Sequence, residues 1–167
     1  REKVVLATKG GYAFSSKGRL LSLVKPMIRK VIGSRPGLVR AAGKMRGGQM
    51  KQDFSRAGLT KSLDDSLKRL KSDYVDIYQL HSPDQETLEK GEVFEILEDF
   101  KQAGKIRAAG VSLLSWAQLA HCYGKGVDFA QLEADFLSGI DRSRELTAAA
   151  KDGIVVAARQ PFGSGLV

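Results

Sequence analysis

The sequence predicts an α/β fold in which helices cover a parallel β-sheet. Short β-branched, apolar runs alternate along the chain with longer segments whose apolar residues recur at helical spacing. The apolar runs lack a strict polar alternation, which is typical of parallel strands that helices cover on both faces. Strands that alternate with amphipathic helices form βαβ units. At 167 residues with 43% hydrophobic residues, the chain has the size and composition of one such domain.

The first predicted strand is KVVLATK at residues 3–9, which breaks at the glycine pair 10–11. The first predicted helix spans residues 59–71, with Thr60 as its candidate N-cap. Its leucines share one helical face: Leu59, Leu63, Leu67 and Leu70. A second strand at 74–81 follows this helix directly.

The next predicted helix covers residues 86–104 and ends at Gly104, a residue suited to the C′ position. Its apolar face carries Val93, Phe94, Leu97 and Phe100. The third strand, IRAAGVS, spans residues 106–112. We therefore expect one further βαβ unit here.

The C-terminal third continues the same alternation. Ser115 and Gln118 have the spacing of a capping box, and Gly153 closes the last helix. The predicted elements are a short helix at roughly 115–122, a strand at 127–133, a helix from Asp141 or Ser143 through Ala150, and a strand at 154–159. These complete a set of five strands.

A long basic segment at about 10–58 interrupts this pattern. Residues 1–56 contain 14 Lys and Arg against 2 Asp and Glu, whereas residues 57–167 contain 13 against 17. The net charge of +8 therefore belongs to this segment and not to the body of the protein. Within it, 20–32 could form a helix interrupted by Pro26, and 33–52 is typical of a loop or weak helix. We interpret the chain as a single domain, 1–167, with a basic insertion.

Composition argues against several classes of protein. The single cysteine, Cys122, excludes an intrachain disulfide, and with two distant histidines, His81 and His121, it does not make a zinc site; we predict no metal. No run of eighteen apolar residues and no signal-peptide pattern is present, so we expect no membrane partner. A reducing cytoplasm fits this composition best.

Polar or ionisable residues lie near the ends of all five predicted strands: Lys9, His81, Ser112, Gln131 and Arg159. Ligands bind at the carboxyl ends of the strands in parallel α/β sheets and barrels. Each residue also has an ordinary interpretation, because a lysine at a strand end is usually solvated and a lone histidine usually packs. Their shared edge indicates a site without naming a reaction.

Four blocks of sequence resemble the aldo-keto reductase superfamily in order and spacing: EKVVLATKGG, LTKSLDDSLKRLKSDYVDIYQLHSPD, GKIRAAGVS and GIVVAARQPFGSGL. The block that ends in DYVDIYQLH is the most specific of them. The resemblance implies a TIM (β/α)₈ barrel, here a partial barrel of about five parallel strands. It also implies an oxidoreductase that interconverts carbonyls and alcohols of small molecules with NADPH, bound without a GxGxxG motif, which this sequence indeed lacks.

The resemblance also implies roles for individual residues. Lys9 matches the family's catalytic lysine and His81 its catalytic histidine. Ser112 and Gln131 would hold the nicotinamide carboxamide. The loop that begins at Arg159 and includes Gly163 would lie beside the cofactor.

The match departs from the family in its acid. The family's aspartate and tyrosine precede the lysine strand, and only eight residues precede Lys9. Tyr78 lies three residues before His81, so alternation along a strand predicts that it faces away from the site. We expect this chain to be a truncated barrel with weak or no reductase activity and with open edges that favour self-association.

Smaller departures concern the cofactor site. Leu113 follows Ser112 where the family usually has Asn, and Ala134-Asp135 replaces a frequent Tyr-Asn. Arg159 stands where many relatives place a stacking aromatic residue. Each change weakens the expectation of ordinary cofactor binding.

An alternative interpretation is a non-enzymatic binding or regulatory module that uses the basic segment 17–51 to hold an acidic partner. A solvated basic lid over a cofactor site explains the same charge. Nucleic acid is not favoured, because no aromatic residue lies between Phe14 and Phe54 to stack on bases.

Overall fold

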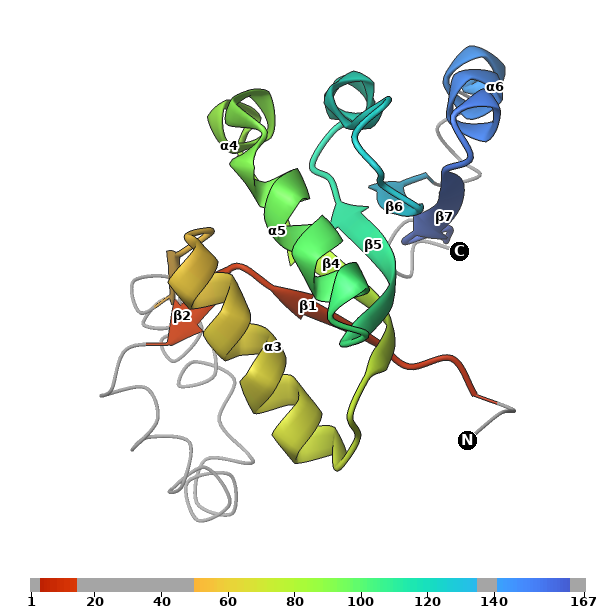
Figure 1. Ribbon diagram of the computed structural model, residues 1–167. Coiled ribbons are helices and arrows are strands. Elements are labelled where there is room, and N and C mark those ends of the chain that lie inside the picture. The colour runs from red at the N-terminus through yellow and green to blue at the C-terminus, as the bar shows by residue number, and fades with distance from the viewer. Residues whose placement is uncertain (1–3, 15–49, 135–140, 163–167) are drawn as a thin grey trace, which may run out of the picture. The chain divides into compact units, whose positions relative to one another are not determined.

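The computed structural model describes residues 4–14, 50–134 and 141–162 (Figure 1). The chain divides into two compact units, one formed by residues 1–11 and 54–167 and the other by residues 12–53. The first unit contains the parallel sheet and the helices that pack on it. No helix in the described part of the chain is long and apolar enough to cross a bilayer.

A five-stranded parallel sheet forms the centre of the first unit, in the order β1-β4-β5-β6-β7. Its strands are β1 (Ala7–Gly10), β4 (Val75–His81), β5 (Ile106–Ser112), β6 (Phe129–Glu133) and β7 (Val155–Arg159). Strands that are consecutive within this unit are neighbours in the sheet, and a helix follows each of β1, β4, β5 and β6. The predicted α/β architecture with a parallel sheet is confirmed.

The core lies between this sheet and the helices that cover it (Figure 1). Alternate residues of β4, Tyr78 and Leu80, point into the core, as do Val111 of β5 and Ala130 of β6. Helix α5 (Glu92–Gln102) contributes Val93, Phe94, Ile96, Leu97 and Phe100. Because these residues occupy the helix side of the sheet, residues such as Gln79 and His81 of β4 lie on its other face.

Helix α3 (Arg56–Leu70) begins earlier than predicted. The Ser55 side chain caps it by accepting a hydrogen bond from the Gly58 backbone N–H at 3.1 Å. Thr60 lies inside the helix, so its prediction as the N-cap is wrong. The apolar face of leucines did mark the helix, since Leu59 and Leu63 are fully buried.

The segment predicted as one helix over 86–104 forms two, α4 (Gln85–Lys90) and α5 (Glu92–Gln102). Gly91 separates them in the left-handed conformation, with φ of 78°. The Asp84 carboxylate caps α4 by accepting from the Thr87 N–H at 2.8 Å. The regular, Glu-rich spacing of residues 86–104 gave no sign of this break. Gly91 permits it, because glycine tolerates a positive φ that strains other residues. Gly104 does follow the end of α5 with φ of 68°, as predicted.

The first strand is shorter than the predicted 3–9. Among the described strands, β1 pairs with β4 alone, and their register begins at Ala7 opposite Ile77. Val4 and Val5 lie outside this pairing and are 60% and 69% exposed, so the expectation of burial is wrong there. Beyond β5, the elements are η1 (Trp116–Cys122), β6, α6 (Ser143–Lys151) and β7, close to the predicted positions.

The second unit contains an antiparallel pair, β2 (Tyr12–Phe14) and β3 (Met50–Gln52). Residues 50–52, predicted as part of a loop or weak helix, are therefore a strand. The Gln52 side-chain amide donates to the Tyr12 hydroxyl at 3.2 Å. The predicted interrupted helix at 20–32 and the rest of the predicted loop, 33–49, lie outside the described residues.

Candidate functional site

The candidate site lies at the carboxyl ends of the parallel strands. His81, Ser112 and Gln131 occupy matching register positions on β4, β5 and β6. Glu133 and Arg159 are paired on β6 and β7, two residues beyond the position of Gln131. Lys9 reaches the same edge from β1, where it is in register with Gln79. The sheet therefore brings together residues that are up to 150 positions apart in sequence.

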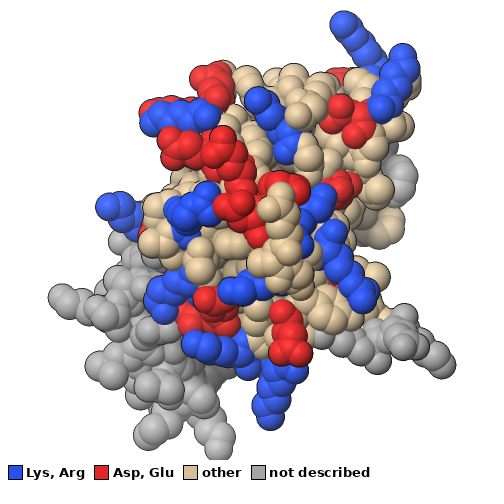
Figure 2. All heavy atoms as spheres, viewed as in Figure 1, with Lys and Arg blue, Asp and Glu red and all other residues tan. Residues whose placement is uncertain are grey.

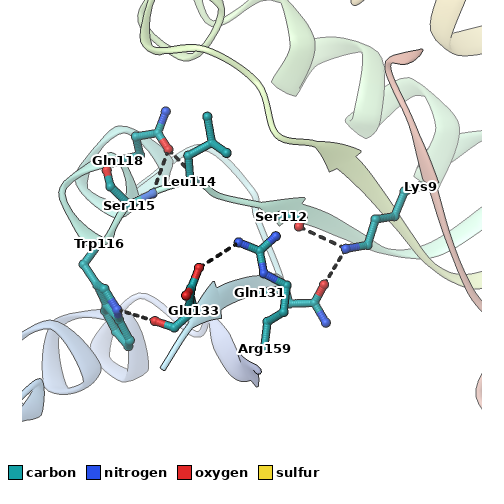
Figure 3. A network of polar contacts seen from close by, with 9 residues as sticks. All are labelled: Lys9, Ser112, Leu114, Ser115, Trp116, Gln118, Gln131, Glu133 and Arg159. Carbon is teal, nitrogen blue, oxygen red and sulfur yellow. Dashed lines mark hydrogen bonds and ion pairs between the residues drawn. The ribbon is translucent and has the colours of Figure 1, made fainter. Parts of the chain in front are cut away.

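Lys9 crosses the sheet face to contact two other strands (Figure 3). Its ammonium donates to the Ser112 hydroxyl at 3.0 Å and makes a close hydrogen bond to Gln131 Oε1. Both acceptors are neutral, and Ser112 is fully buried. Within the described residues, Lys9 has no carboxylate partner. Three of the predicted site residues are thus in direct contact.

The surroundings of Lys9 lower its pKa. Burial is the larger cause and the positive charge of Arg159 the smaller, and both lower the pKa of Lys9 from its usual 10.5. No carboxylate among the described residues forms an ion pair with Lys9, which is consistent with this direction.

His81 ends β4 and is partly buried. Burial, followed by the charges of Lys9 and Arg159, lowers the pKa of His81 from the usual 6.5. The imidazole is therefore mostly neutral at pH 7 and keeps one N–H donor. A neutral imidazole beside an ammonium can donate to an oxygen on which negative charge develops.

Arg159 ends β7 and is held at the sheet edge by Glu133, whose Oε2 lies 3.8 Å from Arg159 Nη2 (Figure 3). Its Nε is buried and has no hydrogen-bond partner among the described residues. A buried donor without a partner is costly, so this nitrogen is available to an acceptor from outside the chain.

Tyr78 faces the opposite side of the sheet from His81, as strand alternation predicted. Its hydroxyl donates to the Leu59 carbonyl at 3.2 Å, and its ring packs edge-on against Phe100 with centroids 5.9 Å apart. Burial raises the pKa of Tyr78 to about 12. This phenol belongs to the core and cannot reach a ligand at the Lys9 face.

The structure describes only some of the residues at which the sequence departs from the family pattern. Leu113 is fully buried, and its backbone N–H donates to the Gln131 carbonyl at 2.9 Å, so it braces β6 and offers no side-chain amide. Gly163 and Asp135 lie outside the described residues. No cluster of three or more His, Cys, Asp or Glu side chains gathers in the described ranges to hold a metal ion.

Sequence reasoning missed three residues that shape this edge. Gln79 is 3% exposed on the Lys9 face, and its Oε1 has no hydrogen-bond partner among the described residues. The Trp116 indole donates to the Glu133 carbonyl at 2.9 Å, and Glu133 in turn pairs with Arg159 (Figure 3). The position of Gln79, two residues before His81, was a usable signal, because residues i and i+2 share a strand face. Nothing in the sequence indicated the Trp116 contact.

These donors and acceptors fit a nicotinamide. The Ser112 hydroxyl and the Gln131 side-chain amide can both bind a carboxamide, and the buried Arg159 Nε can donate to an anionic or carbonyl oxygen.

Comparison with known proteins supplies the family. The aldo/keto reductase family model matches residues 1–167. A 6-dehydroglucose reductase of Novosphingobium aromaticivorans is 38% identical over 118 residues, covering 68% of this chain and 38% of that protein. An NADH-specific methylglyoxal reductase of Escherichia coli is 28% identical over 177 residues, covering 100% of this chain and 46% of that protein.

Solved structures agree on the fold. An aldo-keto reductase of Bacillus halodurans in its holo form superposes with a TM-score of 0.70 at 24% identity, covering 99% of this chain and 46% of that one. The chain therefore spans less than half the length of these relatives, and its five-stranded sheet corresponds to part of their barrel. The predicted partial (β/α)₈ barrel is confirmed. The protein belongs to the aldo/keto reductase family.

Proposed function

We propose that the chain carries the carbonyl-reducing site of an NADP(H)-dependent aldo-keto reductase. The observation that supports this most directly is the contact of Lys9 with Ser112 and Gln131 at the sheet edge where His81 and Arg159 also end. In this proposal Lys9 and His81 act on the substrate carbonyl. Ser112, Gln131 and Arg159 act on the cofactor, with the loop through Gly163 beside it.

The residues divide the work by their chemistry. When bound, the nicotinamide cofactor supplies the hydride. Negative charge would then develop on the carbonyl oxygen, where the N–H of neutral His81 would donate a hydrogen bond and the Lys9 ammonium would stabilise the charge until water supplies the proton that completes the alcohol. Ser112 and Gln131 orient the carboxamide, and the neighbouring cations favour an anionic ligand.

The substrate is proposed to be a small carbonyl compound, and the cofactor NADPH. The similarity to an NADH-specific reductase makes the choice between the two cofactors an experimental question. The chain has one tryptophan, Trp116, whose indole is bonded to Glu133 beside Arg159. Quenching of its fluorescence can therefore report binding of either cofactor.

We expect titration with NADPH to quench Trp116 more strongly, and at lower concentration, than titration with NADH. Lys125→Met is the control for the Lys9→Met variant tested below, because Lys125 lies in an exposed turn before β6. The absence of saturable quenching by either cofactor would contradict the proposed function.

We also expect slow carbonyl turnover by this chain. Tyr78, the tyrosine on the histidine strand, is buried on the wrong face, and loss of a general acid lowers rates by about 10²–10⁴. The test is NADPH oxidation with a panel of aldehydes, comparing wild type with Lys9→Met and His81→Ala. Rapid turnover that either substitution abolishes would contradict the expected low activity while supporting the roles of the two residues.

A further inference from the structure

The Lys9 nitrogen is held at the sheet edge by two neutral side chains. Ser112 Oγ lies 3.0 Å from it, and Gln131 Oε1 makes a closer contact (Figure 3). A free lysine amine has two N–H donors and one lone pair, so these two acceptors can bind both of its hydrogens and leave the lone pair unused. The Lys9 side chain is only partly buried, so a small molecule can reach its nitrogen.

The surroundings of Lys9 favour the free amine more than those of other lysines in the chain. Burial, followed by the positive charge of Arg159, lowers the pKa of Lys9. Desolvation and a neighbouring cation are two ways in which proteins turn a lysine into a nucleophile. Lys101 offers a comparison, because it is also partly buried but pairs with the Asp128 carboxylate at 2.8 Å. An opposite charge favours the protonated form of a lysine.

We propose that Lys9 is also a nucleophile, which binds small aldehydes covalently and reversibly as an imine at the carboxyl edge of the sheet. This activity goes beyond the proposed hydride transfer, because it needs neither the cofactor nor a tyrosine acid. The ammonium form of Lys9 serves the reduction, and the free amine serves the imine. His81 lies near enough for the Lys9 charge to lower its pKa, so its neutral ring is placed to carry a proton in this step.

The step balances without an oxidant or a reductant. The Lys9 lone pair forms the C–N bond while the π electron pair of the carbonyl moves to its oxygen. Neutral His81 takes one proton from the nitrogen and gives it to the oxygen, which yields a neutral carbinolamine. The proton that Lys9 lost to solvent on becoming an amine then returns to the hydroxyl, which leaves as water while the nitrogen lone pair forms the C=N bond. One aldehyde and the ammonium form of Lys9 thus give one protonated imine and one water.

The experiment traps the imine in the absence of cofactor. Propanal is added with sodium cyanoborohydride, which at neutral pH reduces imines to stable secondary amines and spares aldehydes. Peptide mapping by mass spectrometry over time gives the rate of alkylation at Lys9, at Lys101 and at exposed Lys125 in the same molecule. His81→Asn and the matched control His121→Asn are treated identically, and circular dichroism establishes that each variant is folded.

Lys9 is expected to be alkylated at least about tenfold faster than Lys101 and Lys125, a factor below the usual contribution of one acid–base group. His81→Asn should slow alkylation at Lys9 alone, and His121→Asn should leave it unchanged. Equal rates at the three lysines of the folded wild type overturn the inference. Selective alkylation of Lys9 that His81→Asn does not slow supports the nucleophile and overturns the role of His81. Because no cofactor is present, the outcome is separate from Trp116 quenching by NADPH or NADH, and either proposal can fail while the other stands.

Discussion

The packing of Tyr78 leaves no room for a side chain at Gly10. A Cβ at Gly10 would lie 1.8 Å from the Tyr78 hydroxyl oxygen and 2.6 Å from its ring carbon Cζ. Tyr78 is fully buried and bonded to the Leu59 carbonyl, so it has little room to move. The residue beside catalytic candidate Lys9 is therefore a glycine for reasons of packing on the opposite face of β1.

Gly10→Ala is expected to lower the free energy of unfolding by about 1–3 kcal/mol through overpacking. Tyr78→Phe alone should cost about 1 kcal/mol, because it removes the bond to Leu59. In the double variant the missing hydroxyl relieves part of the clash, so the two losses should sum to more than the measured value. Urea unfolding of the four proteins tests this, and strictly additive losses would count against the proposed contact.

The titration of His81 predicts a pH-dependent stability. Burial and the charges of Lys9 and Arg159 lower its folded pKa below the usual 6.5, so the unfolded chain binds the proton more readily. Its contribution to stability is present above pH 6.5 and is lost as the pH falls through the folded pKa. The free energy of unfolding should therefore fall between about pH 7 and pH 5, above the usual range of carboxylates.

His81→Asn should make that fall smaller, since asparagine does not titrate. His121→Asn is the matched control, because His121 is the only other histidine and lies in η1 away from Lys9. Urea denaturation of the three proteins across this pH range is the measurement. Equal pH slopes for wild type and His81→Asn would contradict the assignment.

At the level of single residues, the sequence correctly predicted side-chain orientations that depend on one strand alone. Alternation along β4 placed Tyr78 and His81 on opposite faces, and the structure agrees. The contact between Lys9 and Gln131 could not be predicted, because it spans 122 positions and depends on how four strands align. A side chain as long as lysine also chooses among several partners, and pattern alone does not rank them.

Helix α3 shows how a boundary depends on one hydrogen bond. Both Ser55 and Thr60 are acceptable N-caps by residue type, and the apolar spacing begins at Leu59. The structure selects Ser55, whose hydroxyl accepts from Gly58. The first turn contains no buried apolar residue before Leu59, so periodicity could not detect it.

Ser55→Ala is expected to reduce the free energy of unfolding by about 1 kcal/mol, since it removes the acceptor for a free helix N–H. Thr60→Ala, at a helix-interior position, should be neutral or slightly stabilising because alanine has the higher helix propensity. Thermal unfolding followed by circular dichroism separates the two. A larger loss for Thr60→Ala would restore Thr60 as the cap.

The third strand was placed more accurately than the helix that precedes it. The predicted third strand, 106–112, has the bounds of β5, because an apolar run between a glycine turn and a polar end is unambiguous. The helix predicted over 86–104 failed at Gly91, which lies between two segments that are each helical by composition. A glycine inside such a pattern lowers helix stability without specifying whether the helix ends there.

At the scale of the whole molecule, the chain consists of two units with different charge. Residues 12–53 contain 10 Lys and Arg and one acidic residue, Asp53, a net charge of +9. The whole chain has a net charge of +8, so the remainder has −1. Figure 2 shows basic and acidic side chains mixed on one face of the described residues. The two chain positions that flank this unit are close together, since a Cβ on Gly11 would lie 2.1 Å from the Phe54 ring. A short connection between them is therefore sterically feasible.

Replacement of residues 12–53 by a short Gly-Ser linker is expected to leave the first unit folded with one cooperative transition. Its core residues come from residues 59–154, and the Lys9 contacts are made within the sheet of the first unit, through β1, β4, β5 and β6. Circular dichroism and Trp116 quenching by NADPH are the measurements. Loss of the cooperative transition would show that the basic unit is required for folding. Retained cofactor binding would leave the acidic-partner interpretation of 17–51 to be tested separately.

Strand β7 forms one edge of the sheet, and its Val155 is 63% exposed. An exposed apolar strand edge favours association with another copy. Self-association through this edge is therefore still predicted. Sedimentation velocity at several protein concentrations would test it.

The contact between Lys9 and Gln131 also bears on the order in which the strands assemble during folding. It joins the first strand of the sheet to its fourth, so it closes a loop of 122 positions that local contacts cannot close early. During refolding the Lys9 amine should become fully protected from acylating reagents only after both β5, with Ser112, and β6, with Gln131, have joined the sheet. Pulsed labelling of Lys9 would then show when the sheet has assembled as far as β6.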